Sequence, residues 1–333
     1  MNKKTIRIGF VDFWGDYIPT DGVIYKTLRK KYDIVIDNDK PEYLFFSCYG
    51  YRHIEYEDVV KIFYTHENVF PDFNWCDYSI SYMRDSIGGR NLYFPSAFCH
   101  DEVVVPSHPD ELLNRNFCNF IYSQDYIGYG AKYRKQVCME IMKYRDVDCP
   151  GKVLNNMSSS ELSKRVDKNW NSSKINFLKK YKFTIAFENT NRDGYITEKL
   201  IDPLLAGSVP IYWGSEGNVY PLEKDCMICA NDYPDIDSLM ERIKLVDSHD
   251  DVYMSICQAN PIRKGVLSAY ELKLLNFFDN ICQESQSFLS RNELKLDTLS
   301  HVIRSRWVRS ALKVDQWYQT HAILKKIMKC VSR

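Results

Sequence analysis

The chain has 333 residues, which is enough for two domains of ordinary size that each bury their own core. Its 44 Lys and Arg side chains balance 44 Asp and Glu side chains, so no overall positive field favours nucleic acid. A local basic pocket for a phosphate-bearing ligand is compatible with this balance. The aromatic content is high at 14%, with 24 Tyr, and such rings either stack on sugars or pack at the edge of a core.

The first half of the chain contains short apolar runs that have the length of buried strands. They predict strands over 6–11, 34–36, 43–46, 61–65 and 78–82, with a helix over 22–31. Short apolar strands separated by helices or loops indicate a parallel, doubly wound sheet.

The second half shows a similar alternation. It predicts strands over 117–122, 183–187 and 209–212, and helices over 131–144, 195–206 and 235–246. Gly207 ends the middle helix as a C-cap, so residues 183–212 form one βαβ unit. The expected fold class is therefore α/β, with two Rossmann-like halves that meet somewhere in 105–155.

Eleven cysteines are scattered along the chain, and only Cys226 and Cys229 form a C-x-x-C pair. A zinc site needs a second pair or nearby His ligands, and neither is close in the sequence. The apolar residues inside the pair predict a buried strand, and the cysteines are expected to be structural free thiols in a reducing compartment. No apolar stretch of signal-peptide length follows the N-terminus, so we expect a cytoplasmic protein.

Residues 291–333 form a basic tail. They contain ten Lys or Arg against three Asp or Glu, with Trp307 and Trp317 among apolar residues at helical spacing. Such a segment either lies on an anionic membrane or packs its apolar face on the body of the protein. The first interpretation predicts peripheral contact with the inner face of the cytoplasmic membrane.

The segment from Lys182 to Lys199 has the pattern of a ligand site. A buried strand ends in polar residues, a short loop follows, and a helix then begins. Ligands bind at the carboxyl ends of strands in open α/β sheets, and a helix N-terminus suits a pyrophosphate. Lys199 adds a positive charge there, whereas Glu198 is better explained by sugar hydroxyls or by positive charge at an anomeric carbon. A strand, loop and helix with one Lys and one Glu are also common without any ligand.

Three pieces of this segment together resemble the signature of the α-1,3/4-fucosyltransferases, glycosyltransferase family 10. They are Phe187-Glu188-Asn189, Gly194-Tyr195-Ile196-Thr197-Glu198-Lys199 and Pro210-Ile211-Tyr212-Trp213-Gly214. The match extends over some 30 residues, which makes it far more specific than a single glycine motif.

Two further blocks agree with this resemblance. Tyr64-Thr65-His66-Glu67-Asn68, followed by Pro71 to Asn74 and by Asp77-Tyr78, looks like the acceptor-side motif of the bacterial members. Ser123-Gln124 followed by Tyr133-Arg134 is a weaker match to the place where the family has an Arg on the donor phosphates. His66 departs from the small residue expected there, which puts the approach to Glu67 in doubt.

The resemblance implies a GT-B-like fold in which two Rossmann-like domains face a cleft. Residues 1–130 would bind the acceptor, 131–290 would bind the nucleotide sugar, and 291–333 would be the basic helical tail. It also implies an inverting α-1,3-fucosyltransferase that moves L-fucose from GDP-β-L-fucose to an N-acetylglucosamine or glucose hydroxyl. N-acetyllactosamine in a bacterial surface polysaccharide, such as a lipopolysaccharide O-antigen, is the expected acceptor.

The family resemblance also assigns residue roles. Glu67 would be the general base on the acceptor hydroxyl. Lys199 and Arg134 would stabilise the departing diphosphate, and Tyr195 would donate a further hydrogen bond to it.

Two more residues are assigned to the donor. Asn189 and Glu198 would hold ribose or fucose hydroxyls, and Glu198 would also stabilise positive charge on the fucosyl ring. Glu188 has two interpretations, as a ligand contact or as a structural partner of the loop.

No metal ligand is predicted. No Asp-x-Asp stands at a strand end, and Asp247 to Asp251 are predicted to lie in a solvated polar loop. With Lys and Arg neutralising the diphosphate, Mn²⁺ or Mg²⁺ is expected at most to stimulate. The alternatives are a glycosyltransferase for another nucleotide sugar and a non-catalytic glycan-binding protein with the same fold.

Overall fold

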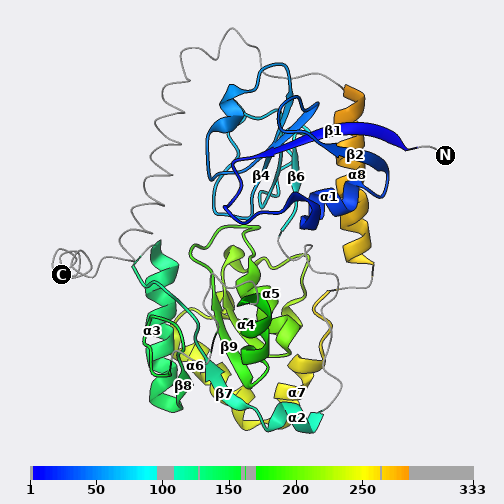
Figure 1. Cartoon of the computed structure of the whole chain (residues 1–333). Coiled ribbons are helices and arrows are strands. Elements are labelled where there is room, and N and C mark those ends of the chain that lie inside the picture. Colours follow the sequence, from blue (N-terminus) through cyan, green and yellow to red (C-terminus); the bar gives the residue numbers. More distant parts are fainter. Residues whose placement is uncertain are drawn as a thin grey trace, which may run out of the picture. The chain divides into compact units, whose positions relative to one another are not determined.

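A computed structural model of the chain describes residues 3–95, 109–126, 128–158, 162, 170–262 and 265–284 (Figure 1). The chain divides into two compact units, and each contains its own sheet. Among the described residues, the first unit comprises those within 3–81, 85–92 and 273–284, and the second comprises those within 82–84, 93–95 and 109–272. The basic tail at 291–333 lies outside the described residues, as does the rest of the chain beyond 284.

The first unit is built on a six-stranded sheet in the order β2-β1-β3-β4-β5-β6. Its strands are β1 (Lys4–Val11), β2 (Tyr32–Ile36), β3 (Tyr43–Phe46), β4 (Val60–Tyr64), β5 (Tyr78–Ser81) and β6 (Asn91–Tyr93). From β2 to β5 every neighbouring pair is parallel. Helix α1 (Val23–Leu28) and the 3₁₀ turns η1 (Pro19–Asp21) and η2 (Arg52–Glu55) connect the first strands. The strands predicted in this half are all present.

Position in the sheet explains which of these strands is buried. The central strands β3 and β4 are buried along their whole length, as their mostly apolar sequences predict, and Lys61 of β4 is buried with them. The prediction that 34–36 is a buried strand is wrong in one respect. Val35 is 45% exposed and Ile36 is 40% exposed, because β2 pairs only with β1 at the edge of the sheet.

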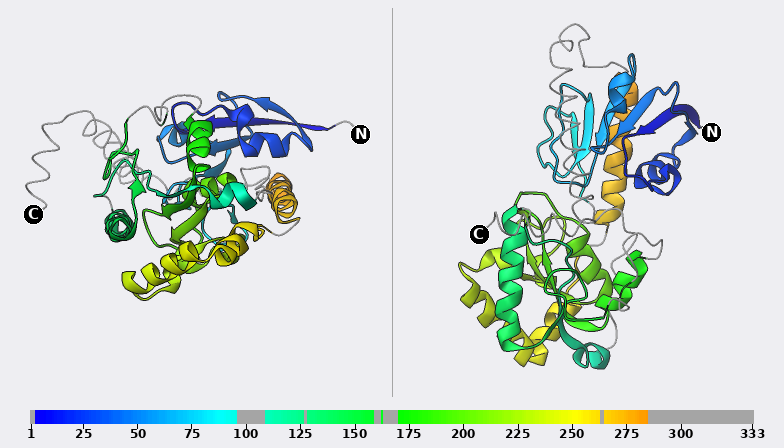
Figure 2. Two further views of the ribbon diagram at one scale, coloured as in Figure 1. Left: turned by 90° about the horizontal axis from the view of Figure 1, so that it is seen from below. Right: turned by 60° about the vertical axis from the view of Figure 1, so that its left-hand side comes forward.

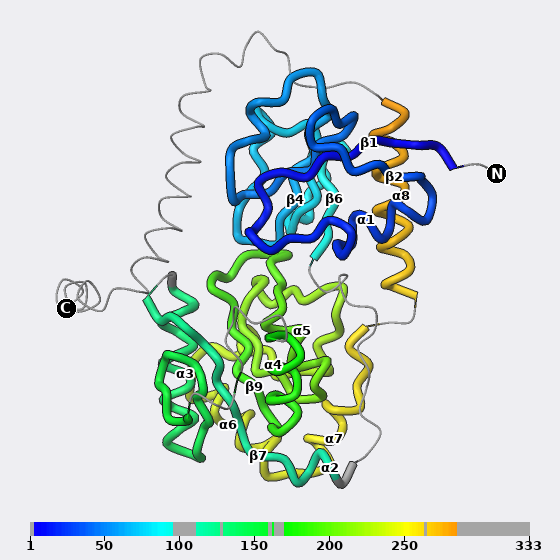
Figure 3. The backbone as a smooth tube through the Cα atoms, viewed as in Figure 1, coloured from blue at the N-terminus to red at the C-terminus, as the bar shows by residue number. Residues whose placement is uncertain are grey.

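The chain returns to the first unit through α8 (Val266–Glu284). Phe278 of this helix stacks on Phe45, with ring centroids 6.0 Å apart, and packs edge-on against Tyr43, with centroids 5.0 Å apart. Asp279 accepts a hydrogen bond from the Tyr32 hydroxyl at 2.5 Å. Figure 3 shows α8, in gold, beside the blue strands of this sheet.

The observed units therefore differ from the predicted domains 1–130 and 131–290. The described residues between 109 and 130 belong to the second unit, because the strand at 116–119 pairs with β9 of the second sheet. Residues 273–284 belong to the first unit, because the rings and carboxylates of α8 pack on its sheet. The expected α/β class with two Rossmann-like, parallel sheets is confirmed.

The second unit contains a five-stranded sheet in the order β11-β10-β9-β7-β8, with every neighbouring pair parallel. Its strands are β7 (Asn116–Asn119), β8 (Val147–Asp148), β9 (Tyr181–Phe187), β10 (Val209–Trp213) and β11 (Ile228–Cys229). Its helices are α2 (Pro109–Leu113), α3 (Gly128–Tyr144), α4 (Trp170–Leu178), α5 (Glu198–Ala206), α6 (Ile236–Ser248) and α7 (Asp250–Gln258).

Side-chain alternation along β9 divides the core of this unit into two layers. Phe183, Ile185 and Phe187 belong to a cluster with apolar residues of α3, α6 and α7. Ala186 belongs to a separate cluster with Leu200 and other residues of α5. Successive strand residues point to opposite faces, so helices cover both sides of the sheet, as the views in Figure 2 show.

Two predictions in this unit need correction. The helix predicted from residue 195 begins at Glu198, because Gly194 turns the chain at φ +79° and Thr197 is the extended N-cap. The segment at 247–251 is not a solvated loop, since α6 and α7 meet there at His249. The Asp247 side chain is only 3% exposed and pairs with Arg145 at 2.8 Å.

The C-x-x-C pair lies where the sequence predicts a buried strand. Cys229 is the last residue of β11, and Cys226 ends a 3₁₀ turn just before it. Both thiols are buried, and burial raises the pKa of each above its usual value. The nine cysteines in the described part of the chain are all free thiols. The reducing compartment inferred from them stays a prediction.

None of the helices among the described residues is long and apolar enough to cross a membrane.

Replacing Gly207 by Ala is expected to lower the free energy of unfolding by about 1–2 kcal/mol. Gly207 caps α5 at φ +64°, ψ +30°, a left-handed conformation that a side chain disfavours. Urea denaturation would measure the change. Gly15→Ala is the control, because its added Cβ would meet no heavy atom within 4 Å. Equal effects of the two substitutions would contradict this account of the cap.

Candidate functional site

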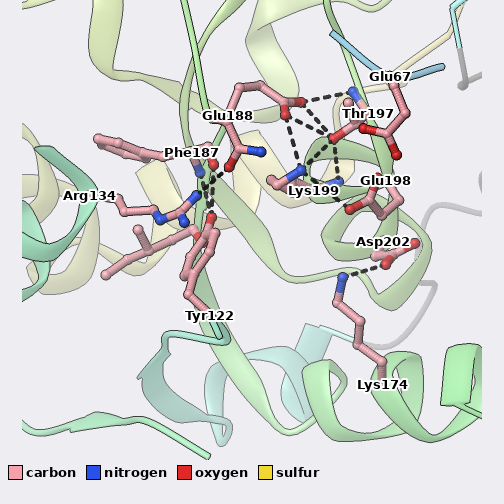
Figure 4. A network of polar contacts seen from close by, with 12 residues as sticks. Glu67, Tyr122, Arg134, Lys174, Phe187, Glu188, Thr197, Glu198, Lys199 and Asp202 are labelled. Atoms are coloured by element: carbon pink, nitrogen blue, oxygen red, sulfur yellow. Dashed lines mark hydrogen bonds and ion pairs between the residues drawn. The ribbon is translucent and has the colours of Figure 1, made fainter. Parts of the chain in front are cut away.

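The residues of the strand–loop–helix motif lie together at the carboxyl end of β9 (Figure 4). The Tyr122 hydroxyl fixes this strand end. It lies 3.1 Å from the carbonyl oxygens of Ile185 and Phe187 and accepts a hydrogen bond from the Phe187 N–H at 2.8 Å. The first turn of α3 packs directly on the next two residues. A Cβ on Gly130 would lie 2.3 Å from the Glu188 carbonyl oxygen, so only glycine fits there.

Glu188 is the buried centre of the motif, with no exposed surface. Its carboxylate accepts hydrogen bonds from the Thr197 N–H at 2.8 Å and from the Thr197 hydroxyl at 2.8 and 3.0 Å. The Lys199 ammonium lies 3.4 Å away. Burial raises the pKa of Glu188, although the Lys199 charge and the Thr197 bonds oppose that shift. Of its two interpretations, the structure supports the structural partner, because Glu188 holds both the helix cap and Lys199.

Lys199 is held in the first turn of α5 by three oxygens. Its Nζ lies 3.1 Å from the Thr197 hydroxyl, 3.3 Å from Glu198 Oε1 and 3.4 Å from Glu188 Oε2. Burial lowers the pKa of Lys199, but the two carboxylates outweigh burial and raise that pKa above its usual value. The ammonium is therefore charged at neutral pH, and 17% of the side chain is exposed.

Glu198 is the first residue of α5, and its side chain is 54% exposed. Partial burial raises the pKa of Glu198, but the ammonium groups of Lys199 and Lys174 outweigh burial and lower that pKa to about 2. Lys174 of α4 forms its own ion pair with Asp202 of α5 at 2.7 Å. Glu198 is thus an ionised and accessible carboxylate next to a fixed cation.

Arg134 comes from α3 and is almost fully buried, with 1% of its surface exposed. Its guanidinium donates to Asn189 Oδ1 at 2.9 Å and to the Gln124 carbonyl at 2.8 Å, and it lies 3.9 Å from the Tyr122 ring centroid. Burial lowers the pKa of Arg134, while the Tyr122 and Glu188 charges oppose that shift. The structure brings Arg134 and Asn189 together as predicted. Direct contact of Arg134 with a diphosphate stays a prediction.

Tyr195 lies in the loop before α5, not in the helix. It is 2% exposed, and its ring packs edge-on against that of Tyr82 with centroids 5.3 Å apart. Gly194 makes this packing possible, since a Cβ there would lie 2.2 Å from the Tyr82 carbonyl oxygen. The Tyr82 hydroxyl in turn accepts a hydrogen bond from Arg192 at 3.2 Å.

Sequence reasoning missed the polar residues that connect the loops after β9 and β10. Asn191 Oδ1 accepts hydrogen bonds from the Glu216 N–H at 2.6 Å and from Asn231 Nδ2 at 3.2 Å. Asn231 Oδ1 accepts from the Gly214 N–H at 3.0 Å. The Ser215 hydroxyl accepts from the Gly194 N–H at 3.0 Å. No local pattern marks Asn231 as a partner of Asn191, which is 40 positions earlier.

Thr197, by contrast, could have been found from the sequence, because a Thr directly before a helix is a recognisable N-cap signal.

Glu67 lies in the first unit, directly after β4, and is exposed. Its Oε1 accepts a hydrogen bond from the Tyr49 hydroxyl at 2.7 Å, and its N–H donates to the Thr65 hydroxyl at 3.0 Å. The His66 side chain contacts Tyr64, and its Nε2 lies 3.2 Å from the Tyr64 hydroxyl. An exposed carboxylate held in this way is geometrically able to accept a proton from a bound hydroxyl.

Among the described residues, no group of three or more His, Cys, Asp or Glu side chains is arranged to hold a metal ion.

Comparison with known families identifies two matches. The family described as "Alpha-(1,3)-fucosyltransferase FucT N-terminal domain" matches residues 8–99. The family described as "Glycosyltransferase family 10 (fucosyltransferase) C-term" matches residues 127–295, which is half of the chain.

Individual relatives agree with this result. The chain is 24% identical to the alpha-(1,3)-fucosyltransferase FucT of Helicobacter pylori, over 89% of this chain and 67% of that protein. It is 30% identical to a putative fucosyltransferase of Acanthamoeba polyphaga mimivirus, over 56% of this chain and only 31% of that protein. The crystal structure of an alpha1,3-fucosyltransferase with GDP-fucose matches with a TM-score of 0.67 and 24% identity, over 84% of this chain and 91% of that one. This structural similarity shows that the chain shares the fold of that protein.

Replacing Lys199 by Met is expected to lower the free energy of unfolding at pH 8 by about 2–4 kcal/mol, because Glu188 is left as an uncompensated buried carboxylate. The pKa of Glu188 is already raised in the folded state. A carboxyl whose pKa is higher in the folded state than in the unfolded state favours folding at low pH. That contribution to the free energy of unfolding is lost as pH rises through the folded-state pKa. The deficit of the variant should therefore narrow at pH 5.5.

Denaturant unfolding at the two pH values would test this. The control is Lys143→Met, which removes an exposed pair with Glu140 and should cost less than about 0.5 kcal/mol at either pH. If Lys199→Met lowers the free energy of unfolding equally at both pH values, the Glu188 carboxylate does not depend on Lys199 for its stabilisation.

Proposed function

Because the chain belongs to glycosyltransferase family 10, the fucosyltransferases, we propose that it transfers L-fucose from GDP-β-L-fucose to a glycan and forms an α-1,3 linkage. The accepting hydroxyl belongs to N-acetylglucosamine or glucose in a unit such as N-acetyllactosamine. The names of the relatives support the α-1,3 linkage, and the crystal structure with GDP-fucose supports this donor.

The observation that carries the proposal is the fixed cation at the N-terminus of α5. Lys199 is charged, partly accessible and held by Thr197 and two carboxylates. The helix N-terminus adds the positive end of the helix dipole. A nucleoside diphosphate supplies the negative charge that such a site favours.

The proposed reaction is a single displacement that inverts the anomeric centre. Glu67 takes the proton from the acceptor hydroxyl, whose oxygen forms a bond to C1 of fucose as the bond from C1 to the diphosphate oxygen breaks. GDP leaves with the electron pair. Lys199, and Arg134 through its own charge, stabilise the negative charge that grows on the diphosphate.

The remaining predicted residues position the donor. Tyr195 donates a hydrogen bond to the phosphates, and Asn189, oriented by Arg134, holds a sugar hydroxyl. Glu198 is ionised and exposed, so it can accept hydrogen bonds from fucose hydroxyls and stabilise positive charge on the ring. Mn²⁺ or Mg²⁺ supplies at most additional screening of the diphosphate in this mechanism.

The cellular role is proposed on the same basis. We place the enzyme in bacterial surface polysaccharide synthesis, such as that of a lipopolysaccharide O-antigen, at the inner face of the cytoplasmic membrane. The basic composition of residues 291–333 supports peripheral contact with anionic lipid. Titration with several nucleotide sugars separates this proposal from its nearest rival, because tighter binding of a uridine donor would favour another glycosyltransferase. Binding of glycan without any turnover would favour a glycan-binding protein.

Replacing Glu67 by Gln is expected to lower kcat for fucose transfer by about 10²- to 10⁴-fold, because the amide cannot accept the acceptor proton. The measurement is release of GDP from GDP-fucose with N-acetyllactosamine, together with calorimetric binding of GDP. GDP affinity should be unchanged. Glu57→Gln, at an exposed Glu of the same unit, is the matched control and should keep wild-type turnover. Full activity of Glu67→Gln would exclude Glu67 as the base.

Removal of divalent metal by EDTA is expected to leave turnover measurable, because Lys199 and Arg134 supply the positive charge. Added Mn²⁺ should raise the rate without being required. The same GDP-release assay, run on metal-depleted protein, gives the answer. Complete loss of turnover in EDTA, restored by Mn²⁺, would contradict this part of the mechanism.

A further inference from the structure

The loops after three neighbouring strands of the first unit converge beside Glu67. Strands β1, β3 and β4 are adjacent and parallel, so their carboxyl ends lie at the same edge of the sheet. Trp14 follows β1, Tyr49 follows β3 and Glu67 follows β4. This edge is where ligands bind in open α/β sheets.

A hydrogen bond between two buried side chains connects the first two loops. Asp12 and His53 have side chains that are 2% and 3% exposed, and His53 Nδ1 lies 2.7 Å from Asp12 Oδ2. The Asp12 carboxylate also accepts hydrogen bonds from the N–H groups of Arg52 and His53, at 2.9 Å each. The Asp12 carbonyl accepts one from the Tyr49 N–H at 3.0 Å.

Electrostatics keep this connection in place. Burial raises the pKa of Asp12, but the hydrogen bonds and the charge of His53 outweigh burial and hold that pKa below its usual value. Asp12 lies at φ +61°, a strained conformation for a residue other than Gly, and Gly50 leaves room for its carboxylate. A Cβ on Gly50 would lie 2.2 Å from Asp12 Oδ1. The strained turn therefore sets where the next residues point.

Those residues present an aromatic surface. Phe13 and Tyr17 stack with centroids 4.0 Å apart, and Trp14 packs edge-on against Tyr17 at 4.8 Å and against Tyr49 at 6.1 Å. Trp14 remains 39% exposed although its neighbours hold it in place. The Tyr49 hydroxyl donates to Glu67 Oε1 at 2.7 Å. One ring thus contacts both the exposed indole and the carboxylate.

We infer that Trp14 and Tyr49 form the platform on which the acceptor sugar lies. The Trp14 indole stacks on the apolar C–H face of a pyranose such as the galactose of N-acetyllactosamine. Tyr49 is a positioning residue, because it orients the Glu67 carboxylate toward the accepting hydroxyl of the neighbouring N-acetylglucosamine or glucose. This inference rests on the proposed function in taking Glu67 as the base, and it adds the surface that selects the acceptor.

Substitutions of Trp14 and of Tyr49 should change different kinetic constants. Trp14→Ala is expected to raise the acceptor KM about tenfold, with the KM for GDP-fucose unchanged, because only sugar stacking is lost. Trp14→Phe keeps a ring and should recover part of the acceptor affinity. Tyr49→Phe keeps the ring beside Trp14 but removes the hydrogen bond to Glu67, so kcat should fall while the acceptor KM stays near wild type.

The control is Val35→Ala, which alters another exposed apolar side chain of the same unit, on the edge strand β2. Thermal unfolding of each variant checks that the fold is intact. An acceptor KM of Trp14→Ala equal to that of Val35→Ala would overturn the platform while the proposed function stands. A simultaneous rise of the KM for GDP-fucose would also overturn it, because the effect would then be general.

A second measurement does not depend on turnover. N-acetyllactosamine is titrated into wild type, Trp14→Phe and Val35→Ala without donor, and tryptophan fluorescence is recorded. Saturable quenching in wild type and Val35→Ala that disappears in Trp14→Phe supports the platform, even if fucose is never transferred and the proposed function fails. Equal quenching in all three proteins, or none in the wild type, overturns the platform.

Discussion

The buried carboxylate of Glu188 is the constraint on which the nucleotide-sugar motif depends. It ends a buried strand, accepts hydrogen bonds from the N-cap of α5 and lies 3.4 Å from the ammonium of Lys199. A charge without exposed surface is costly unless it is paired and hydrogen-bonded. The helix start and the lysine position therefore follow from satisfying Glu188. The same requirement explains why two glycines are needed nearby, since a Cβ on Gly130 or Gly214 would overlap Glu188.

The first unit uses the same physical device at its own sheet edge. Asp12 follows β1 as Glu188 follows β9, and both are buried carboxylates that accept backbone N–H groups of a later segment. Asp12 ties together two loops that are distant in the sequence, whereas Glu188 closes the single loop between β9 and α5. In the second unit the ordered group is a cation, Lys199. In the first it is an exposed ring, Trp14, next to the carboxylate Glu67. Each edge is therefore preorganised, and its ordering cost is met during folding.

Elements with strong periodicity could be predicted closely, and edges and junctions could not. The short runs of β3, β4 and β9 are rich in aromatic and β-branched residues, and they were correctly predicted as buried strands. The run of β2 looks the same in sequence, yet it lies at a sheet edge, and sheet order is a long-range property. Asp247 appears solvated in sequence because its partner Arg145 is 102 positions away. The return of α8 to the first unit was missed for the same reason. Phe278 packs against Tyr43, but the residues of the second unit separate the two in the sequence.

The sequence alone determined the α/β class and the family, because the strand periodicity and the residues from Phe187 to Gly214 are local. It also placed Arg134, Asn189, Glu198 and Lys199 among the site residues. Only the tertiary structure decided which of these are buried and what each one contacts. It made Glu188 the partner that fixes Lys199, gave Arg134 the task of orienting Asn189, and joined Trp14, Tyr49 and Glu67 at one sheet edge. The physical reason is that pairing and burial depend on strand order, which no local pattern encodes.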